Sequence, residues 1–316
     1  MNPSLIVCPV EFSAGGKSAL GRALTLAQWH DAELHALYVR PGRARHTRSN
    51  DTANLSLQAR LVDFIREVNP DGLAVTPVVL MGSPAKAVAE YARLKSADLV
   101  VVGRNGRRGS RFLSSGVRAT DVARAVSCPT LIVSNEPTPD TSGGASFGNI
   151  LCGIDFSPTS LHALRNALTL AQQSGGRLTL LHVLEGFPGE SVYSGSGAFR
   201  LIGEYWARVE KVKRELRALV PLEALNWCEV DTEAVSGIPH GSILAVALAR
   251  NADLVVVGSP RRTRLDRILM ASTVAGVLRR ARCPVLAVPE ISSVTETVSR
   301  PTTDRKDADQ AVASLA

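Results

Sequence analysis

Aromatic residues make up only 4% of this 316-residue chain. That is too few for a surface of interleaved rings that would stack the bases of single-stranded nucleic acid. No apolar run reaches the length that a membrane-spanning helix needs. The first residues enter strand-like sequence at once, without a basic and then apolar leader, so we expect a cytoplasmic protein.

Cysteine is also sparse, and no spacing of cysteine and histidine fits a zinc site. Four of the five cysteines occupy matching positions of an internal repeat, Cys8 with Cys152 and Cys128 with Cys283. Matching positions belong to separate domains, so we expect no disulfide within either pair. We interpret these residues as small buried hydrophobic side chains.

The repeat itself is the strongest feature of the sequence. The stretch Ala97–Gly103 recurs letter for letter as Ala252–Gly258, at a shift of 155 residues. A second stretch, residues 23–28, recurs as residues 167–172 at a shift of 144. The chain therefore contains two copies of one unit, each of normal domain size.

The difference between the two shifts, eleven residues, predicts an insertion in the second copy between Val183 and Gly237. We predict one domain over residues 1–135 and a second over 148–290. Residues 136–147 are polar and contain Pro and Gly, which is typical of a linker. Residues 291–316 contain few large apolar side chains, so we expect a mostly disordered tail.

Strand-like and helix-like segments alternate along both copies. In the first copy we predict strands near 4–10, 34–39, 72–80, 99–102 and 130–133, a loop over 41–50, and helices near 15–30, 55–68, 84–95 and 117–127. In the second we predict strands near 149–154, 177–183, 227–235, 253–257 and 285–288, and helices near 158–174, 198–219, 240–250 and 272–282. This order indicates two tandem α/β domains, each with a five-stranded parallel sheet covered on both faces.

A ligand site in such a sheet lies at the carboxyl ends of the strands, where the strand order reverses. The loops after the first and fourth strands are the expected walls, and in the first copy these are Glu11–Ser13 and Gly103–Gly116. The loop Gly103–Gly116 contains several glycines and arginines, and the chain as a whole has a net charge of +7. Glycines let backbone N–H groups approach a phosphate closely. A flexible connection that uses glycine only for its turns is the structural alternative.

The spacing of Gly103, Gly106 and Gly116, with an acid after the first strand, resembles the universal stress protein family and in particular its tandem members. The resemblance covers residues 4–135 and 148–290, and it implies a Rossmann-like fold of the type that binds adenine nucleotides. It implies that the loop holds nucleotide phosphates, that the acid (here Glu11, where the family has Asp) contacts the nucleoside, and that the backbone of Val39 contacts adenine. The hydroxyl residue of the family pattern is replaced by Val117.

The second copy keeps a different part of the family pattern. Asp155 restores the aspartate and Ser272 restores the hydroxyl, but Arg261 and Ala271 replace two of the glycines. Pro260 also removes one N–H group from the loop. We therefore expect the second copy to hold triphosphate poorly. In the family, the last strands of two protomers pair, which implies that strands 130–133 and 285–288 pair within this chain as an internal pseudo-dimer.

The resemblance implies a non-enzymatic stress-response protein that binds ATP or another adenine nucleotide, with magnesium, in its first domain. We predict no catalytic residue, no metal site of the protein's own and no membrane partner; the protein partner is unknown. Three alternatives remain: slow ATP hydrolysis at the same site, an adaptor for anions or nucleic acid, and a protein scaffold with vestigial pockets. The expected nucleotide-binding residues are Glu11, Ser13, Val39, Gly103, Arg104, Gly106, Arg107, Gly116 and Val117, and in the degenerate second site Asp155, Val183, Gly258 and Ser272.

Overall fold

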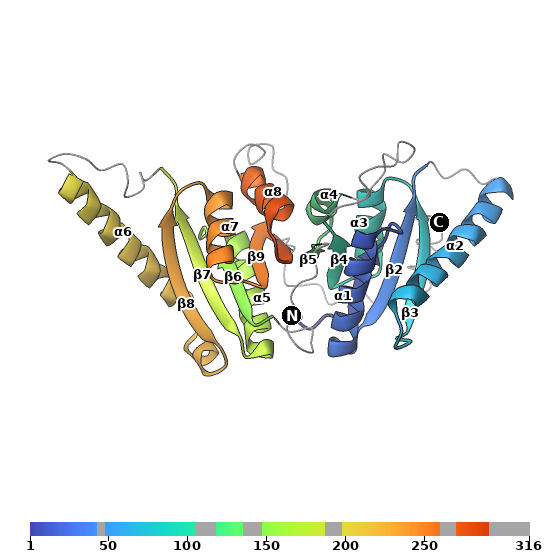
Figure 1. Cartoon of the computed structure of the whole chain (residues 1–316), viewed down its shortest axis with the longest axis horizontal. Helices are drawn as coiled ribbons and strands as arrows, with labels where there is room; N and C mark the ends of the chain where they lie inside the picture. Colours follow the sequence, from blue (N-terminus) through green and yellow to red (C-terminus); the bar gives the residue numbers. More distant parts are fainter. Residues whose placement is uncertain (43–47, 105–117, 135–146, 187–197, 260–269, 291–316) are drawn as a thin grey trace, which may run out of the picture. The chain divides into compact units, whose positions relative to one another are not determined.

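The computed structural model divides the chain into two compact units, an N-terminal unit over Asn2–Ala145 and a C-terminal unit over Ser146–Glu290 (Figure 1). It describes residues 1–42, 48–104, 118–134, 147–186, 198–259 and 270–290. The predicted tail and all of the predicted linker except Phe147 therefore lie outside the described residues. None of the helices in the described ranges is long and apolar enough to cross a membrane.

The N-terminal unit alternates strands and helices along its whole length. Its elements are β1 (Leu5–Pro9), α1 (Ala14–His30), β2 (Glu33–Arg40), α2 (Arg48–Val68), β3 (Val75–Met81), α3 (Pro84–Leu94), β4 (Leu99–Gly103), α4 (Ala119–Ala125) and β5 (Thr130–Val133). The C-terminal unit repeats this order with β6 (Asn149–Gly153), α5 (Pro158–Ser174), β7 (Arg177–Leu184), α6 (Ala198–Ala218), η2 (Leu222–Asn226), β8 (Glu229–Ser236), α7 (Pro239–Ala249), β9 (Leu254–Ser259), α8 (Met270–Arg280) and β10 (Val285–Pro289).

Each unit has five parallel strands, in the order β3-β2-β1-β4-β5 and β8-β7-β6-β9-β10. In the N-terminal unit α1 and α2 pack on one face of the sheet, and α3 and α4 pack on the other (Figure 1). The central strands are therefore covered twice, and every residue of β1 and β4 is buried. Continuous apolar runs are what a strand with two covered faces requires. The predicted α/β class is confirmed.

The aspartate of the duplicated stretch has a structural function in both units. One carboxylate oxygen of Asp98, Oδ2, accepts hydrogen bonds from the Ser4 N–H (2.8 Å), the Ser4 hydroxyl (2.6 Å) and the Leu5 N–H (3.1 Å). Asp253 binds the two N–H groups of Gly148 and Asn149 in the same way. Both aspartates thus hold the entry of one central strand against the entry of its neighbour, which explains why the repeat contains an acid just before its buried run.

Two predicted details need correction. Residues 48–50 were expected in a loop, but α2 already begins at Arg48, because its polar first turns continue the helix beyond the apolar period that starts near Leu55. The five-residue 3-10 helix η2 was not predicted. The buried residues of α6 repeat those of α2 at a shift of 148, since Leu61 and Phe64 correspond to Val209 and Val212. The shift between the two copies is thus 144 before α6, 148 within it and 155 after it. Four of the eleven inserted residues therefore precede α6 and seven follow it, and η2 lies in the part that follows.

Candidate functional site

The strand order of the N-terminal unit reverses between β1 and β4, which are hydrogen-bonded neighbours. Glu11 and Ser13 follow β1, while Gly103 ends β4 and Arg104 follows it. The structure therefore brings these four predicted residues to the same carboxyl edge of the sheet. Loops that diverge from two neighbouring strands at such a reversal form the usual ligand crevice of open α/β sheets.

Gly103 packs directly against the first turn of α1. A Cβ atom built on Gly103 would lie 2.6 Å from the Gly15 carbonyl oxygen and 2.9 Å from its carbonyl carbon. Gly258 has the same relation to α5, where a Cβ would lie 2.9 Å from the Ser160 nitrogen. Backbone-to-backbone contact therefore requires glycine at both positions, whether or not a phosphate binds there. Gly103 is necessary for the close packing of β4 against α1, but its presence is weak evidence for a ligand.

Ser13 also has a structural function, as the N-cap of α1. Its hydroxyl oxygen accepts a hydrogen bond from the Gly16 N–H at 3.1 Å. Ser157 caps α5 in the same way, accepting from the Ser160 N–H at 3.2 Å. Capping satisfies a backbone donor that the helix leaves without a partner. The N-terminus of α1, with its partial positive charge, is thereby held beside the end of β4.

Phe12, between Glu11 and Ser13, adopts the left-handed backbone conformation with φ 48°, and Phe156 matches it at φ 63°. The Phe12 ring stacks on Tyr38 with centroids 4.6 Å apart, and it meets the edge of Phe64 at 5.4 Å. The guanidinium carbon of Arg60 lies 4.3 Å from the Phe12 centroid. A left-handed backbone conformation at a residue other than glycine must be enforced by surrounding contacts. The ring contacts of Phe12 supply them, and they thereby anchor the turn that carries Glu11.

The acid of the C-terminal unit is held by its own turn. Asp155 Oδ1 accepts from the Ser157 N–H at 2.9 Å and from the Ser157 hydroxyl at 2.6 Å. Partial desolvation favours the neutral carboxyl, but the hydrogen bonds from Ser157 and Ser160 together outweigh it and lower the pKa of Asp155. Nearby, the Phe156 ring lies against His182, whose Nδ1 is 2.8 Å from the Ile154 carbonyl oxygen. The Asp155 carboxylate is thus ionised and oriented at neutral pH.

Some of the remaining predicted site residues lie within the described part of the chain, and others lie outside it. Val39 and Val183 lie near the carboxyl ends of β2 and β7, the strands next to β1 and β6. Ser272 lies in the first turn of α8. Four predicted residues of the glycine-rich loop, Gly106, Arg107, Gly116 and Val117, lie outside the described residues. Within the described ranges, no group of three His, Cys, Asp or Glu side chains is arranged to hold a metal ion.

Sequence reasoning did not identify Arg60 as a neighbour of the site. Arg60 lies on α2, which is far from Phe12 along the chain, and an exposed arginine in a helix carries no signal of its own. The only available hint was that Leu61 and Phe64 define the buried side of that helix, which places position 60 at its border.

The chain was compared with known proteins. A sequence profile described as the universal stress protein family matches residues 4–134 and 146–289. A universal stress protein of Mycolicibacterium smegmatis is 28% identical over 307 residues, which cover 90% of this chain and 96% of that protein. One from Methanocaldococcus jannaschii is 29% identical over 153 residues, 46% of this chain and 85% of that protein.

Among solved structures, a universal stress protein from Archaeoglobus fulgidus superimposes with a TM-score of 0.61 at 19% identity. The superposition covers 92% of this chain and 97% of the Archaeoglobus fulgidus chain, so the two proteins share the fold over nearly their whole length. Each half of the chain matches the family profile separately, and the two matches together span most of the sequence. The chain therefore belongs to the universal stress protein family, as a tandem member with two copies of the family's domain.

Proposed function

We propose that this protein is a non-enzymatic stress-response regulator whose N-terminal unit binds ATP or another adenine nucleotide. The observation that carries the proposal is the convergence of the Glu11–Ser13 turn and the Gly103–Arg104 end of β4 at the strand-order reversal. Contact between Gly103 and Gly15 keeps these two segments together. Glu11 is the hydrogen-bond acceptor for a ribose hydroxyl, and the arginines of residues 104–111 supply positive charge for phosphates.

Nucleotide binding would act through a shift of populations. A ligand that contacts both the β1 turn and the β4 loop favours the conformations in which the two are closest, and it stabilises them by its differential affinity. A protein partner that reads this surface would then respond to the nucleotide. Magnesium, if it is present, would arrive with the nucleotide.

The C-terminal unit is the degenerate site in this proposal. Its acid, Asp155, is already held by Ser157, and its loop carries arginine and alanine where the first copy has Gly106 and Gly116. We expect side chains at those positions to leave less room for phosphates than glycine does. We expect this unit to bind adenine nucleotide more weakly than the N-terminal unit.

The experiment is calorimetric titration of ATP into the full chain, after heat release and chromatography of any nucleotide that copurifies. Gly106→Arg copies the C-terminal unit and is expected to remove most of the binding. Asp155→Asn changes the corresponding acid of the other unit and serves as the matched control, with binding expected near wild type. Equal titration of wild type and Gly106→Arg would refute the site. Steady phosphate release with ATP and magnesium would instead favour the ATPase alternative.

A further inference from the structure

The outer edges of the two sheets differ, although the units are copies of each other. β3 is the outermost strand of the N-terminal sheet and β8 that of the C-terminal sheet. An outermost strand exposes backbone N–H and C=O groups that invite another strand to pair with it. Proteins usually close such an edge, so the way each unit treats it is informative.

The N-terminal edge is closed at its middle by two residues. Pro77 in β3 has no N–H group to offer, and its carbonyl oxygen accepts a hydrogen bond from the Gln58 side chain of α2 at 3.0 Å. Because backbone groups along a parallel ladder point alternately to either side of the strand, the Pro77 carbonyl points away from β2. Proline is tolerated in an edge strand only in this orientation. Further pairing at this point of β3 is therefore blocked.

The C-terminal edge lacks both of these closures. Pro77 of β3 is paired with Ala36 of β2, and at the equivalent position of the C-terminal unit Thr232 of β8 is paired with Leu180 of β7. Thr232 is therefore the counterpart of Pro77. Thr232 thus points its own N–H and C=O groups away from β7. Among the described residues no strand pairs with that side of β8. The Thr232 hydroxyl oxygen is also buried without a hydrogen-bond partner among them.

The capping glutamine is replaced as well. At the shift of 148 that relates α6 to α2, Gln58 corresponds to Trp206. Its side chain is 47% exposed, which is unusual for so large an apolar group. Trp206 belongs to α6, which packs on β8. Gln58 reaches the edge strand of its own unit from the equivalent helix position, so an aromatic ring at this position would anchor the apolar side chains of an added strand.

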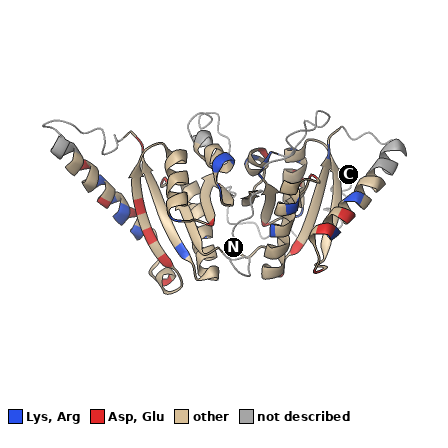
Figure 2. Ribbon diagram, viewed as in Figure 1, with Lys and Arg blue, Asp and Glu red and all other residues tan. Residues whose placement is uncertain are grey.

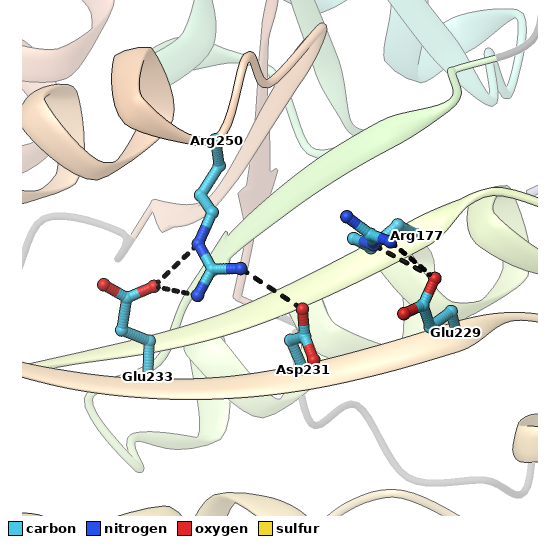
Figure 3. A network of polar contacts seen from close by, with 5 residues as sticks. All are labelled: Arg177, Glu229, Asp231, Glu233 and Arg250. Atoms are coloured by element: carbon cyan, nitrogen blue, oxygen red, sulfur yellow. Dashed lines mark hydrogen bonds and ion pairs between the residues drawn. The ribbon is translucent and has the colours of Figure 1, made fainter.

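The opposite face of β8 is acidic. Glu229, Asp231 and Glu233 alternate along the strand and share one face, where Ala74, Thr76 and Val78 stand in the first unit. Arg177 binds Glu229 at 2.8 Å, and Arg250 binds both Asp231 at 3.3 Å and Glu233 at 2.9 Å (Figure 3). Figure 2 shows acidic residues, drawn in red, along β8. Three carboxylates meet two guanidinium groups, so the face keeps negative charge for a basic partner.

We propose that the open edge of β8 binds an extended segment of another protein in which Lys or Arg alternates with apolar residues. The basic side chains would lie beside Asp231 and Glu233, and the apolar ones would lie on the Trp206 side. A second copy of this chain fits poorly, because antiparallel pairing of two β8 edges places carboxylates beside carboxylates, which is destabilising. The proposed nucleotide site is not involved.

The test uses a fluorescein-labelled peptide in which Lys and Val alternate, with fluorescence anisotropy of the full chain as the readout. One comparison peptide has the same residues in two blocks, and another alternates Glu with Val. The alternating basic peptide is expected to bind best, and its affinity should fall as salt rises. Binding should also slow hydrogen exchange of the β8 amides. Equal binding of the block peptide, or exchange that stays unchanged in β8, would overturn the proposal.

Three variants locate the binding. Thr232→Pro copies Pro77 and is expected to weaken the peptide about tenfold by removing one backbone donor and blocking the edge. Asp231→Thr combined with Glu233→Val copies the first unit without touching the backbone, so it decides the question even if Thr232→Pro does not fold.

The matched control is Glu223→Gln, which removes an exposed acid outside the strand and should bind as wild type does. Wild-type affinity in the β8 variants would refute the assignment. So would a wild-type dimer that Thr232→Pro converts to monomer, because a second copy would then occupy the edge.

Discussion

Replacing Gly103 with alanine tests whether the end of β4 is constrained by packing. The added Cβ would lie 2.6 Å from the Gly15 carbonyl oxygen. Real carbon–oxygen contacts are longer, so β4 or the first turn of α1 must move by several tenths of an ångström. Overpacking of this kind costs about 1–3 kcal/mol. Because the obstacle is backbone and cannot rotate away, we expect the upper half of that range.

The assay is thermal and urea unfolding of the full chain without nucleotide. A loss of about 2–3 kcal/mol corresponds to a decrease of roughly 5–10 °C in the Tm of a unit of this size. Gly258→Ala should destabilise the C-terminal unit similarly, since its Cβ would lie 2.9 Å from the Ser160 nitrogen. These effects are predicted in the absence of any ligand.

The control is Gly21→Ala, inside α1. Its Cβ would find only the Val68 Cγ1 atom, at the ordinary contact distance of 3.8 Å. Alanine is the better helix former, so this change should stabilise the unit by about 0.5–1 kcal/mol. If Gly103→Ala were as stable as wild type, the packing explanation would be wrong, and the glycine would have to be explained by its ligand.

Three further predictions concern single residues of the N-terminal unit. Asp98→Ala removes the acceptor for both Ser4 donors and should cost about 2–3 kcal/mol in urea unfolding; a loss below about 0.5 kcal/mol would show that the clamp is unimportant. The Nδ1 atom of His35 lies 2.9 Å from the Tyr91 hydroxyl, and burial lowers the pKa of this imidazole. Its contribution to the free energy of unfolding is therefore complete above 6.5, the pKa of histidine in the unfolded chain, and is lost as the pH falls below that value. We expect the urea midpoint of the wild type to fall as the pH is lowered toward 5. It should fall less in the double variant His35→Thr, Tyr91→Val. An equal fall in both proteins would contradict the prediction. Burial also raises the pKa of the Cys8 thiol, so a thiol reagent should label it only after denaturation, and rapid labelling of the native chain would refute its burial.

The sequence alone determined the architecture of this protein. Buried strands and amphipathic helices are encoded by periodicities within a few residues, so the runs around Val101 and Val256 and the helices between them were predictable. Most of the predicted strands and helices agree with the observed elements to within one or two residues. The duplication strengthened each interpretation, because two versions of one pattern had to satisfy the same fold. Convergence of Glu11 and Gly103 at one edge then followed from the parallel strand order.

Only the tertiary structure decided what individual residues do. The contact of Gly103 with Gly15, the clamp made by Asp98 and the stacking of Arg60 on Phe12 join residues that are far apart in sequence. No local pattern encodes such approaches, because they depend on how helices and loops lie on the sheet. The same holds for the edge at Thr232, which becomes visible only when its register is set beside that of Pro77. Secondary structure is a local property of this chain, whereas its glycine contacts, clamps and open edge are properties of its packing.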